Sequence, residues 1–401
     1  MELHSIYYEK ATKYIKSQVI NNMKNYIKRK LDNPSLLRKN KVLVIYGPRR
    51  VGKTTIMDSL IGDADGYIKR VTGDDISVQT TISSRQLEVL EPWLSGVNLL
   101  AIDEAHEIKE IGKALKLIVD NIEEITVVIT GSSSFNIEQA TGEPLVGRKT
   151  VVHLYPFAQQ EVLSLYTNAY ELRENLVNYL VFGSYPEAIL AETISEKIET
   201  ITGIVNSYLM KDILAFANLR GALPIFNLLK LLAFQMGSEV SLNELSDKVG
   251  IDIKTVGRYI ELLEKSFIIK RLTPYSPNRR REITSKNKYY FIDNGIRNGT
   301  ISQFNGIENR NDIGPLFENF IVMEFFKKQA NDRAYGELYF WRNYDEQEID
   351  LLLIKDGHIQ PYEIKYNPKA KIKKTSFTDN NHEVLPIKVI NSENYLEYLL
   401  D

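Results

Sequence analysis

The sequence contains no cysteine and only five histidines among 401 residues. A chain without cysteine forms no disulfide, offers no thiol nucleophile and builds no thiolate zinc site. The histidines lack the spacing of metal ligands, and we assign His106 to solvent or a helix surface. This composition is typical of a reducing compartment, so we expect a cytoplasmic protein.

Long apolar runs are equally absent. No stretch approaches the roughly 20 apolar residues that a membrane helix requires, and the first ten residues lack the pattern of a signal peptide. Charge is balanced, with 50 basic and 52 acidic side chains and a net charge of −2. We therefore expect no membrane partner, and affinity for nucleic acid has to come from local basic patches. The length predicts more than one domain.

Residues 10–31 predict a basic amphipathic helix. Apolar side chains recur there at helical spacing, and lysines and arginines surround them. We interpret this segment as a scaffold helix with a solvated basic face. Contact with nucleic acid or a membrane is the alternative.

Three short apolar runs, 41–47, 98–104 and 126–132, are separated by helix-length segments. This is the pattern of buried parallel strands, so residues 1–155 are predicted to form an α/β domain with a parallel sheet. Residues 156–222 have a mostly helical pattern with a turn signal at 183–186, which predicts a helical lid.

Residues 223–293 contain three helix-sized units followed by two strand-like runs around a polar loop. Three helices and a β-hairpin are the order of a winged helix. Residues 294–401 open with a helix at 315–328 and continue with strand-like runs at 337–343, 348–354 and 361–366. They predict a second α/β domain.

The segment GPRRVGKTT, residues 47–55, follows an apolar strand and precedes a helix start. It contains G-x-x-x-x-G-K-T, a pattern whose main-chain N–H groups hold phosphates at a helix N-terminus. Lys53 is predicted to reach the β- and γ-phosphates of ATP, and Thr54 to place its hydroxyl on Mg²⁺. The alternative is a glycine-rich turn. The predicted nucleotide-binding residues are Gly47, Pro48, Arg49, Arg50, Val51, Gly52, Lys53, Thr54, Thr55 and Asp103.

The segment LLAIDEAH supplies two adjacent carboxylates at the end of an apolar strand. Asp103 is predicted to lie beside the metal ion with Thr54, and Glu104 to polarise the attacking water. The alternative is an acidic pair in solvent at the end of a strand.

Two further catalytic residues are predicted downstream. Thr130 or Ser132, after the third strand, could contact the γ-phosphate or the water, and we favour Ser132; ordinary polar turn residues are the alternative. Arg148 is predicted to be an arginine finger that reaches its own nucleotide or that of a neighbouring subunit. A solvated arginine is the alternative.

Two basic groups in residues 223–293 predict contacts with DNA. The third helix presents Lys254, Thr255 and Arg258 on its first turns, and the hairpin loop is dense in cations. Wings often contact the phosphate backbone, although solvated arginines in a module that packs between domains are the alternative. The cations of the hairpin are Arg279, Arg280, Arg281, Lys286 and Lys288.

A second site is predicted near the C-terminus. Glu363 and Lys365 lie two apart on a strand and therefore point the same way, and Asp350 lies on the preceding strand. Asp350 and Glu363, with Glu318 completing the cluster, are predicted to hold Mg²⁺, while Lys365 positions water or offsets charge on a phosphate. A same-face charge pair without catalytic function is the alternative.

These segments together resemble a known family. GPRRVGKTT, LLAIDEAH, ITGSSS, the GR at 147–148 with LYPF soon after, and GSYPEA are similar to bacterial and archaeal AAA-type ATPases whose C-terminal domain has no settled function. The resemblance covers residue 20 to the end and implies an ATPase core with a lid, a winged helix and a restriction-endonuclease-like domain. Relatives have PLSF where this chain has YPFA at 155–158, a departure within the lid segment. Glu318, Asp350 and the Glu-x-Lys of Glu363 and Lys365 resemble, in this order, the nuclease motif PD-(D/E)xK.

The sequence therefore predicts an ATPase, assembled as a homo-oligomer, that engages duplex or branched DNA through the winged helix and the nuclease-like domain, with DNA cleavage as a second activity. The competing hypothesis is a nucleotide-dependent switch that binds a protein partner through a non-catalytic C-terminal docking domain. Salt-sensitive DNA binding distinguishes the two.

Overall fold

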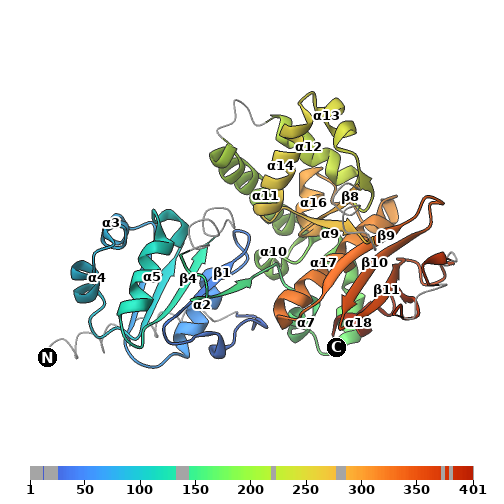
Figure 1. Ribbon diagram of the computed structural model, residues 1–401. Helices are drawn as coiled ribbons and strands as arrows, with labels where there is room; N and C mark the ends of the chain where they lie inside the picture. Colours follow the sequence, from blue (N-terminus) through green and yellow to red (C-terminus); the bar gives the residue numbers. More distant parts are fainter. Residues whose placement is uncertain are drawn as a thin grey trace. The chain divides into compact units, whose positions relative to one another are not determined.

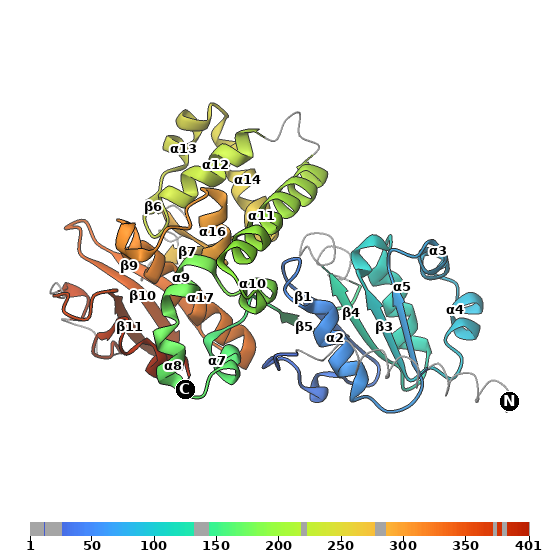
Figure 2. The ribbon, with the colours of Figure 1, turned by 180° about the vertical axis from the view of Figure 1, so that it is seen from behind.

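The structure is a computed structural model, and it describes residues 12, 26–131, 144–217, 223–276, 286–371, 375–378 and 383–400, with the backbone alone at 207–217. The chain forms two compact units, Met1–Tyr155 and Pro156–Asp401. Figures 1 and 2 show the elements of both units from opposite sides. In the described residues, no helix is long and apolar enough to cross a membrane.

The first unit contains a five-stranded parallel sheet in the order β2-β3-β4-β1-β5. The predicted α/β fold with a parallel sheet is thereby confirmed. Because β4 lies between β1 and β3, the ends of these three strands are neighbours. The strands are β1 Lys41–Tyr46, β2 Ile68–Thr72, β3 Leu99–Asp103, β4 Thr126–Gly131 and β5 Lys149–His153, and the helices are α2 Lys53–Gly62, α3 Ile76–Ser84, α4 Leu87–Trp93 and α5 Ile111–Asn121.

The second unit begins with helices that share one hydrophobic core. This core includes Val181 and Tyr185 from the predicted lid, and Leu228 and Ile260 from the predicted winged helix. The expected three helices and two strands occur in order, but their apolar faces pack with α9 to α11. The helices are α7 Gln159–Val162, α8 Ala169–Glu174, α9 Leu176–Phe182, α10 Pro186–Leu190, α11 Ile194–Ala217, α12 Leu223–Phe234, α13 Leu242–Val249 and α14 Ile253–Lys265.

A seven-stranded sheet runs through the rest of the second unit, in the order β12-β11-β10-β9-β7-β8-β6. The hairpin of β7 and β8 joins the C-terminal strands because β7 pairs in parallel with β9 at Thr273 and Pro274. The sheet is thus continuous across the predicted boundary between residues 293 and 294. Its strands are β6 Glu239–Val240, β7 Ile269–Pro274, β8 Asn287–Phe291, β9 Glu337–Arg342, β10 Glu348–Lys355, β11 His358–Ile364 and β12 Lys388–Ile390; α16 Asn294–Thr300, α17 Ile313–Asp332 and α18 Tyr395–Leu399 complete the unit.

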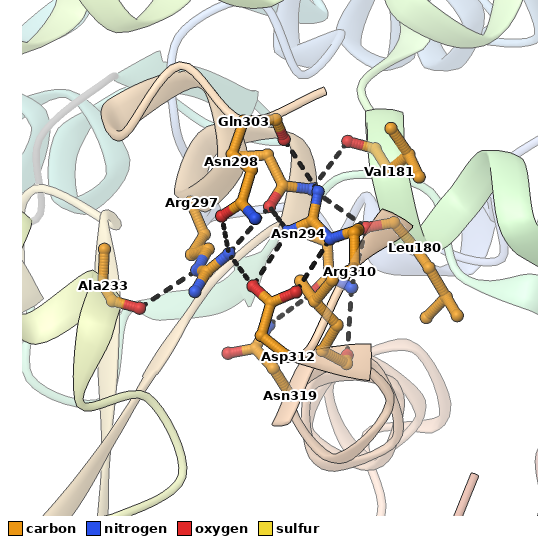
Figure 3. Close-up of polar contacts among 11 residues, drawn as sticks. Leu180, Val181, Ala233, Asn294, Arg297, Asn298, Gln303, Arg310, Asp312 and Asn319 are labelled. Carbon is orange, nitrogen blue, oxygen red and sulfur yellow. Dashed lines mark hydrogen bonds and ion pairs between the residues drawn. The ribbon is translucent and has the colours of Figure 1, made fainter. Parts of the chain in front are cut away.

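A buried polar network joins these parts (Figure 3). Arg297 pairs with Asp312 and donates to the main-chain oxygen of Ala233 in α12 at 3.0 Å. Asn298 donates to the main-chain oxygens of Leu180 (3.1 Å) and Val181 (2.8 Å) in α9. Because an unpaired buried polar group is costly, this satisfied network holds α9, α12 and α16 in one arrangement.

The predicted N-terminal helix is wrong in its last turn. Residues 26–31 are not helical, and Arg29 is buried instead of solvated. Its guanidinium donates to the main-chain oxygens of Val51 (3.1 Å) and Tyr155 (2.6 Å), because a buried guanidinium requires hydrogen-bond acceptors. Apart from Thr12, residues 10–25 lie outside the described residues.

Candidate nucleotide site and acid–lysine cluster

The predicted phosphate loop lies between β1 and α2. Gly52 caps the helix with a φ of +92°, a left-handed conformation that favours glycine. At Gly47 the backbone passes so close to β5 that a Cβ atom would lie 2.2 Å from the main-chain oxygen of Leu154. These glycines are therefore required by the local backbone.

Lys53 is buried at the start of α2, with an exposed fraction of 5%. Its ammonium donates to the main-chain oxygens of Gly47 (3.1 Å) and Pro48 (2.8 Å). The ammonium therefore faces the loop that precedes the helix N-terminus, which itself favours anions.

Thr54 and Asp103 meet although they lie 49 positions apart. The Thr54 hydroxyl donates to Asp103 Oδ2 at 2.9 Å, and the Thr130 hydroxyl from β4 donates to Asp103 Oδ1. Thr130 also accepts a hydrogen bond from the Glu104 main-chain N–H at 3.1 Å and is fully buried. The strand order thus gathers a hydroxyl and two carboxylates beside the loop.

Glu104 has a positive φ of +48° and contacts His106, whose Nδ1 lies 3.1 Å from Glu104 Oε2. Burial raises the pKa of Glu104, but the hydrogen bond from His106 and the positive charges of Lys53 and Arg49 outweigh it and hold that pKa below its ordinary value. Glu104 is therefore a carboxylate near neutral pH, the form in which a general base accepts a proton.

The first site fits a magnesium-bound nucleotide. The buried ammonium of Lys53 and the helix N-terminus suit phosphates, and the oxygens of Thr54 and Asp103 are the hard donors that Mg²⁺ prefers. These residues would hold the phosphates and the metal ion, which would neutralise charge that develops on the transferred phosphoryl group.

The catalytic predictions for Arg148 and Ser132 have different outcomes. The Arg148 main-chain oxygen accepts a hydrogen bond (2.9 Å) from Val42 at the start of β1, whereas the phosphate loop follows the other end of that strand. The two ends of β1 are about 15 Å apart, and the Arg148 guanidinium pairs with Asp120. This placement does not support contact with its own nucleotide, and the arginine finger stays a prediction. Ser132 lies outside the described residues.

The sequence analysis ranked one supporting residue too low and missed two others. It favoured Ser132 over Thr130, yet Thr130 contacts both acidic residues. His106 lies two positions after Glu104 with a side chain that is 8% exposed, so solvent does not explain it. The run D-E-x-H was a usable signal for His106, whereas Arg29 had no local signal because its partners lie far along the chain.

The second site brings together three of its four predicted members. Lys365 Nζ lies 2.9 Å from Asp350 Oδ2 and 2.9 Å from Glu363 Oε2. Burial and the nearby Asp350 carboxylate raise the pKa of Glu363 to about 7, against the opposing charge of Lys365. The same two carboxylates hold the pKa of Lys365 above its ordinary value, although burial lowers it.

Glu318 joins a neighbouring group of charges. Tyr290 donates to Glu318 Oε1 at 2.7 Å, and Lys288 Nζ lies 3.3 Å from the same oxygen and also pairs with Glu348. Lys288 is 1% exposed, so the prediction that it contacts DNA is wrong, because its charge is buried between carboxylates. Among the described residues, no three acidic or histidine side chains are arranged to hold a metal ion.

Ion pairs with Lys288 and Lys365 join six residues that we call the acid–lysine cluster: Lys288, Glu318, Glu348, Asp350, Glu363 and Lys365. The predicted three-acid ligand set is therefore corrected at Glu318, which pairs with Lys288 in place of joining Asp350 and Glu363. A metal ion held by Asp350 and Glu363 stays a prediction.

The predicted DNA contacts on α14 have separate surroundings. Lys254 and Arg258 are exposed, whereas the Thr255 hydroxyl donates to Asp252, the residue that caps the helix, at 2.6 Å. Lys286, before β8, is exposed. Arg279, Arg280 and Arg281 lie outside the described residues.

Family comparisons match the chain in three segments. Residues 39–163 match the AAA domain family, residues 173–307 match a domain of unknown function (DUF8612), and residues 313–394 match another domain of unknown function (DUF4143). Together with the phosphate-loop geometry described above, the match of residues 39–163 supports an AAA-type P-loop domain in the first unit, as the sequence predicted.

Comparisons with whole proteins add relatives of unassigned activity. Uncharacterized protein Rv2008c of Mycobacterium tuberculosis is 24% identical over 343 residues, which are 84% of this chain and 73% of that protein. Uncharacterized protein MJ1544 of Methanocaldococcus jannaschii is 23% identical over 337 residues, 79% of this chain and 73% of that protein.

Two solved structures show weak likeness. A signal transduction ATPase (STAND) protein with a tetratricopeptide repeat sensor, PH0952 of Pyrococcus horikoshii, has a TM-score of 0.27 at 14% identity and covers 72% of this chain and 43% of its own. RuvB of Thermotoga maritima has a TM-score of 0.28 at 14% identity, and the match covers 61% of this chain and 87% of the RuvB chain. Both scores are too low for either likeness to carry an argument.

Proposed function

We propose that the first unit binds ATP with Mg²⁺ and hydrolyses it. The observation that carries this proposal is the convergence of Thr54, Asp103 and Thr130 beside the buried ammonium of Lys53. In this proposal Lys53 binds phosphate, Thr54 and Asp103 hold the metal ion, and Glu104 orients and deprotonates the attacking water.

Two substitutions test the ATPase. Lys53→Met removes a charge-assisted phosphate contact, and we expect ATP turnover to fall by about 10²–10³-fold. Glu104→Gln keeps the shape but removes the base, so turnover falls by about 10²–10⁴-fold while ATP stays bound. Calorimetry and phosphate release measure both, with Lys113→Met at an exposed position of α5 as the control. Undiminished turnover in both variants would contradict the proposal.

We further propose that the second unit engages DNA through the winged-helix region and the C-terminal domain, in an assembly of several subunits. Exposed Lys254, Arg258 and Lys286 support phosphate contacts. Metal-dependent cleavage at Asp350, Glu363 and Lys365 is the finer proposal, supported by their shared face and mutual contacts. DNA incubated with Mg²⁺ or Mn²⁺ should be cut by the protein and not by Asp350→Ala or Lys365→Ala. Cleavage that persists in both would indicate contamination.

A protein-binding switch is the second candidate, favoured by one observation. The acid–lysine cluster holds Lys288 and Lys365 in contact with two carboxylates each, which suits a structural site as well as an active one. Such a switch should bind duplex DNA no more strongly at low salt than at high salt.

A further inference from the structure

The segment after β11 has an unusual charge. Residues 364–378 contain five lysines and no acidic residue, whereas the whole chain has a net charge of −2. Lys369 and Lys371 of this segment are described, and both are exposed. Local positive charge of this density attracts a polyanion, and its position in the fold shows what lies beside it.

The described parts of this segment lie near the end of the sheet that carries the acid–lysine cluster. Residues 365–371 follow β11 directly after the cluster member Lys365, and the main-chain N–H and hydroxyl of Ser376 donate to Gln347 Oε1 at 2.9 and 2.8 Å. Gln347 directly precedes β10. Between Lys365 and Ser376, Asn367 accepts a hydrogen bond (2.9 Å) from the main chain of Lys369 and forms a turn. Lys369 and Lys371 therefore follow the cluster member Lys365 by only four and six positions.

A third exposed lysine, Lys286, directly precedes β8 and lies two positions before Lys288. Lys288 contacts Glu348 at the start of β10, and Arg342 of β9 contacts Glu239 of β6 at 3.3 Å. These contacts bring the two halves of the sheet together at this end. Lys286 is exposed, whereas Lys288 is buried.

We propose that Lys286, Lys369 and Lys371 form a surface that binds the phosphodiester backbone of a nucleic acid beside the acid–lysine cluster. The cluster acids have lysine partners, so the exposed lysines supply the positive charge that an approaching chain meets. Lysine binds phosphate as a point charge without reading bases, so this surface positions the chain and does not select sequence. The inference rests on the proposed engagement of DNA and names its surface.

Fluorescence anisotropy with a labelled DNA duplex tests the surface. Each phosphate contact contributes about 0.9 to the slope of log affinity against log salt. The double variant Lys369→Ala/Lys371→Ala should therefore reduce the slope by about 1.8, and Lys286→Ala by about 0.9. An RNA duplex should show the same losses, because the contacts are to phosphate.

The matched control is Lys109→Ala/Lys116→Ala, which removes two exposed lysines of the first unit and changes the net charge equally. Its slope should equal that of the unaltered protein. If the protein binds DNA and all variants keep the full slope, the proposed lysine surface is wrong, whereas the proposal that the second unit engages DNA is retained. If the unaltered protein shows no salt-sensitive binding, both fail. If polyglutamate displaces DNA at equal charge concentration, the proposal that this surface binds nucleic acid is wrong, and an acidic protein is the ligand.

Discussion

The phosphate loop and the acid–lysine cluster each contain a buried lysine, Lys53 and Lys288, and the cluster adds the half-buried Lys365, but these lysines have different partners. Lys53 donates to two main-chain oxygens, which carry no net charge. Lys288 and Lys365 each contact two carboxylates. The same residue type is thus positioned for an incoming anion in the first unit and largely neutralised within the protein in the second.

The difference shows how much structure each of the two sequence motifs specifies. G-x-x-x-x-G-K-T specifies a backbone conformation, and the conformation then supplies the chemistry. Glu-x-Lys specifies only that two side chains share a face, and ion pairing is sufficient to explain it. Substitutions of Lys288 and Glu363 test whether the acid–lysine cluster is held together by its own charges, and substitutions of Thr130 and His106 test the first site.

The largest expected effect is on stability at Lys288. Lys288→Met leaves Glu318 and Glu348 without this buried partner, and breaking such a pair costs about 3–5 kcal/mol of the free energy of unfolding. Urea unfolding measures it. Lys265→Met, which breaks an exposed pair with Glu261, should cost about 1 kcal/mol or less. Equal losses would remove the contrast between buried and exposed pairs.

The next effect is the pH dependence contributed by Glu363. Its pKa in the folded protein is about 7, above its ordinary value of 4.5, so the folded state binds more protons between these values. Stability from this group is therefore present below its unfolded pKa and is lost as pH rises through 7. Glu363→Gln should remove this loss, on the order of 2 kcal/mol between pH 5 and pH 8. Urea unfolding at several pH values with EDTA measures it, and an unchanged pH profile would contradict the assignment.

A smaller effect concerns Thr130 in the first unit. Thr130→Val keeps the shape but removes the hydroxyl that contacts Asp103 and Glu104. We expect ATP turnover to fall by about 5- to 30-fold with little change in ATP affinity, since the substitution removes two hydrogen bonds that contribute about 1 kcal/mol each. Thr130→Ser should retain turnover because it retains the hydroxyl. Loss in Thr130→Ser as well would show that packing, and not hydrogen bonding, is responsible.

The smallest expected effect is that of His106 on the pH dependence of ATP turnover. The hydrogen bond from His106 helps to keep the pKa of Glu104 below its ordinary value, although burial raises it. His106→Asn should therefore move the acidic limb of ATP turnover to higher pH by less than about one unit. If the acidic limb stays at the same pH and turnover is otherwise intact, His106 does not influence the pKa of Glu104.

Sequence patterns predicted the interior strands of the first unit better than its edges. β1, β3 and β4 are nearly continuous apolar runs because both faces are covered. β2 and β5 lie at the edges and are only partly buried, so their mixed sequences, IKRVT and KTVVH, carry no such signal. The strand order that joins Asp103 to Thr130 was likewise invisible, because register depends on packing across the chain.

In the second unit, the sequence predicted most elements but not how they join. The helix and strand patterns of residues 223–275 and 315–366 were correct, yet the pairing of Thr273 with Tyr339 was not anticipated. Lys288 shows the consequence, since its place in a basic loop sequence predicted contact with DNA. Its partner, Glu348, lies 60 positions away, and local charge density contains no information about it.

The parallel pairing of β7 with β9 also limits how this protein can be divided. A fragment that starts at residue 294 would lose the neighbour of β9 and present an open strand edge, a template for intermolecular pairing. We therefore expect such a fragment to aggregate, whereas one that starts near Pro156 keeps every strand of the larger sheet.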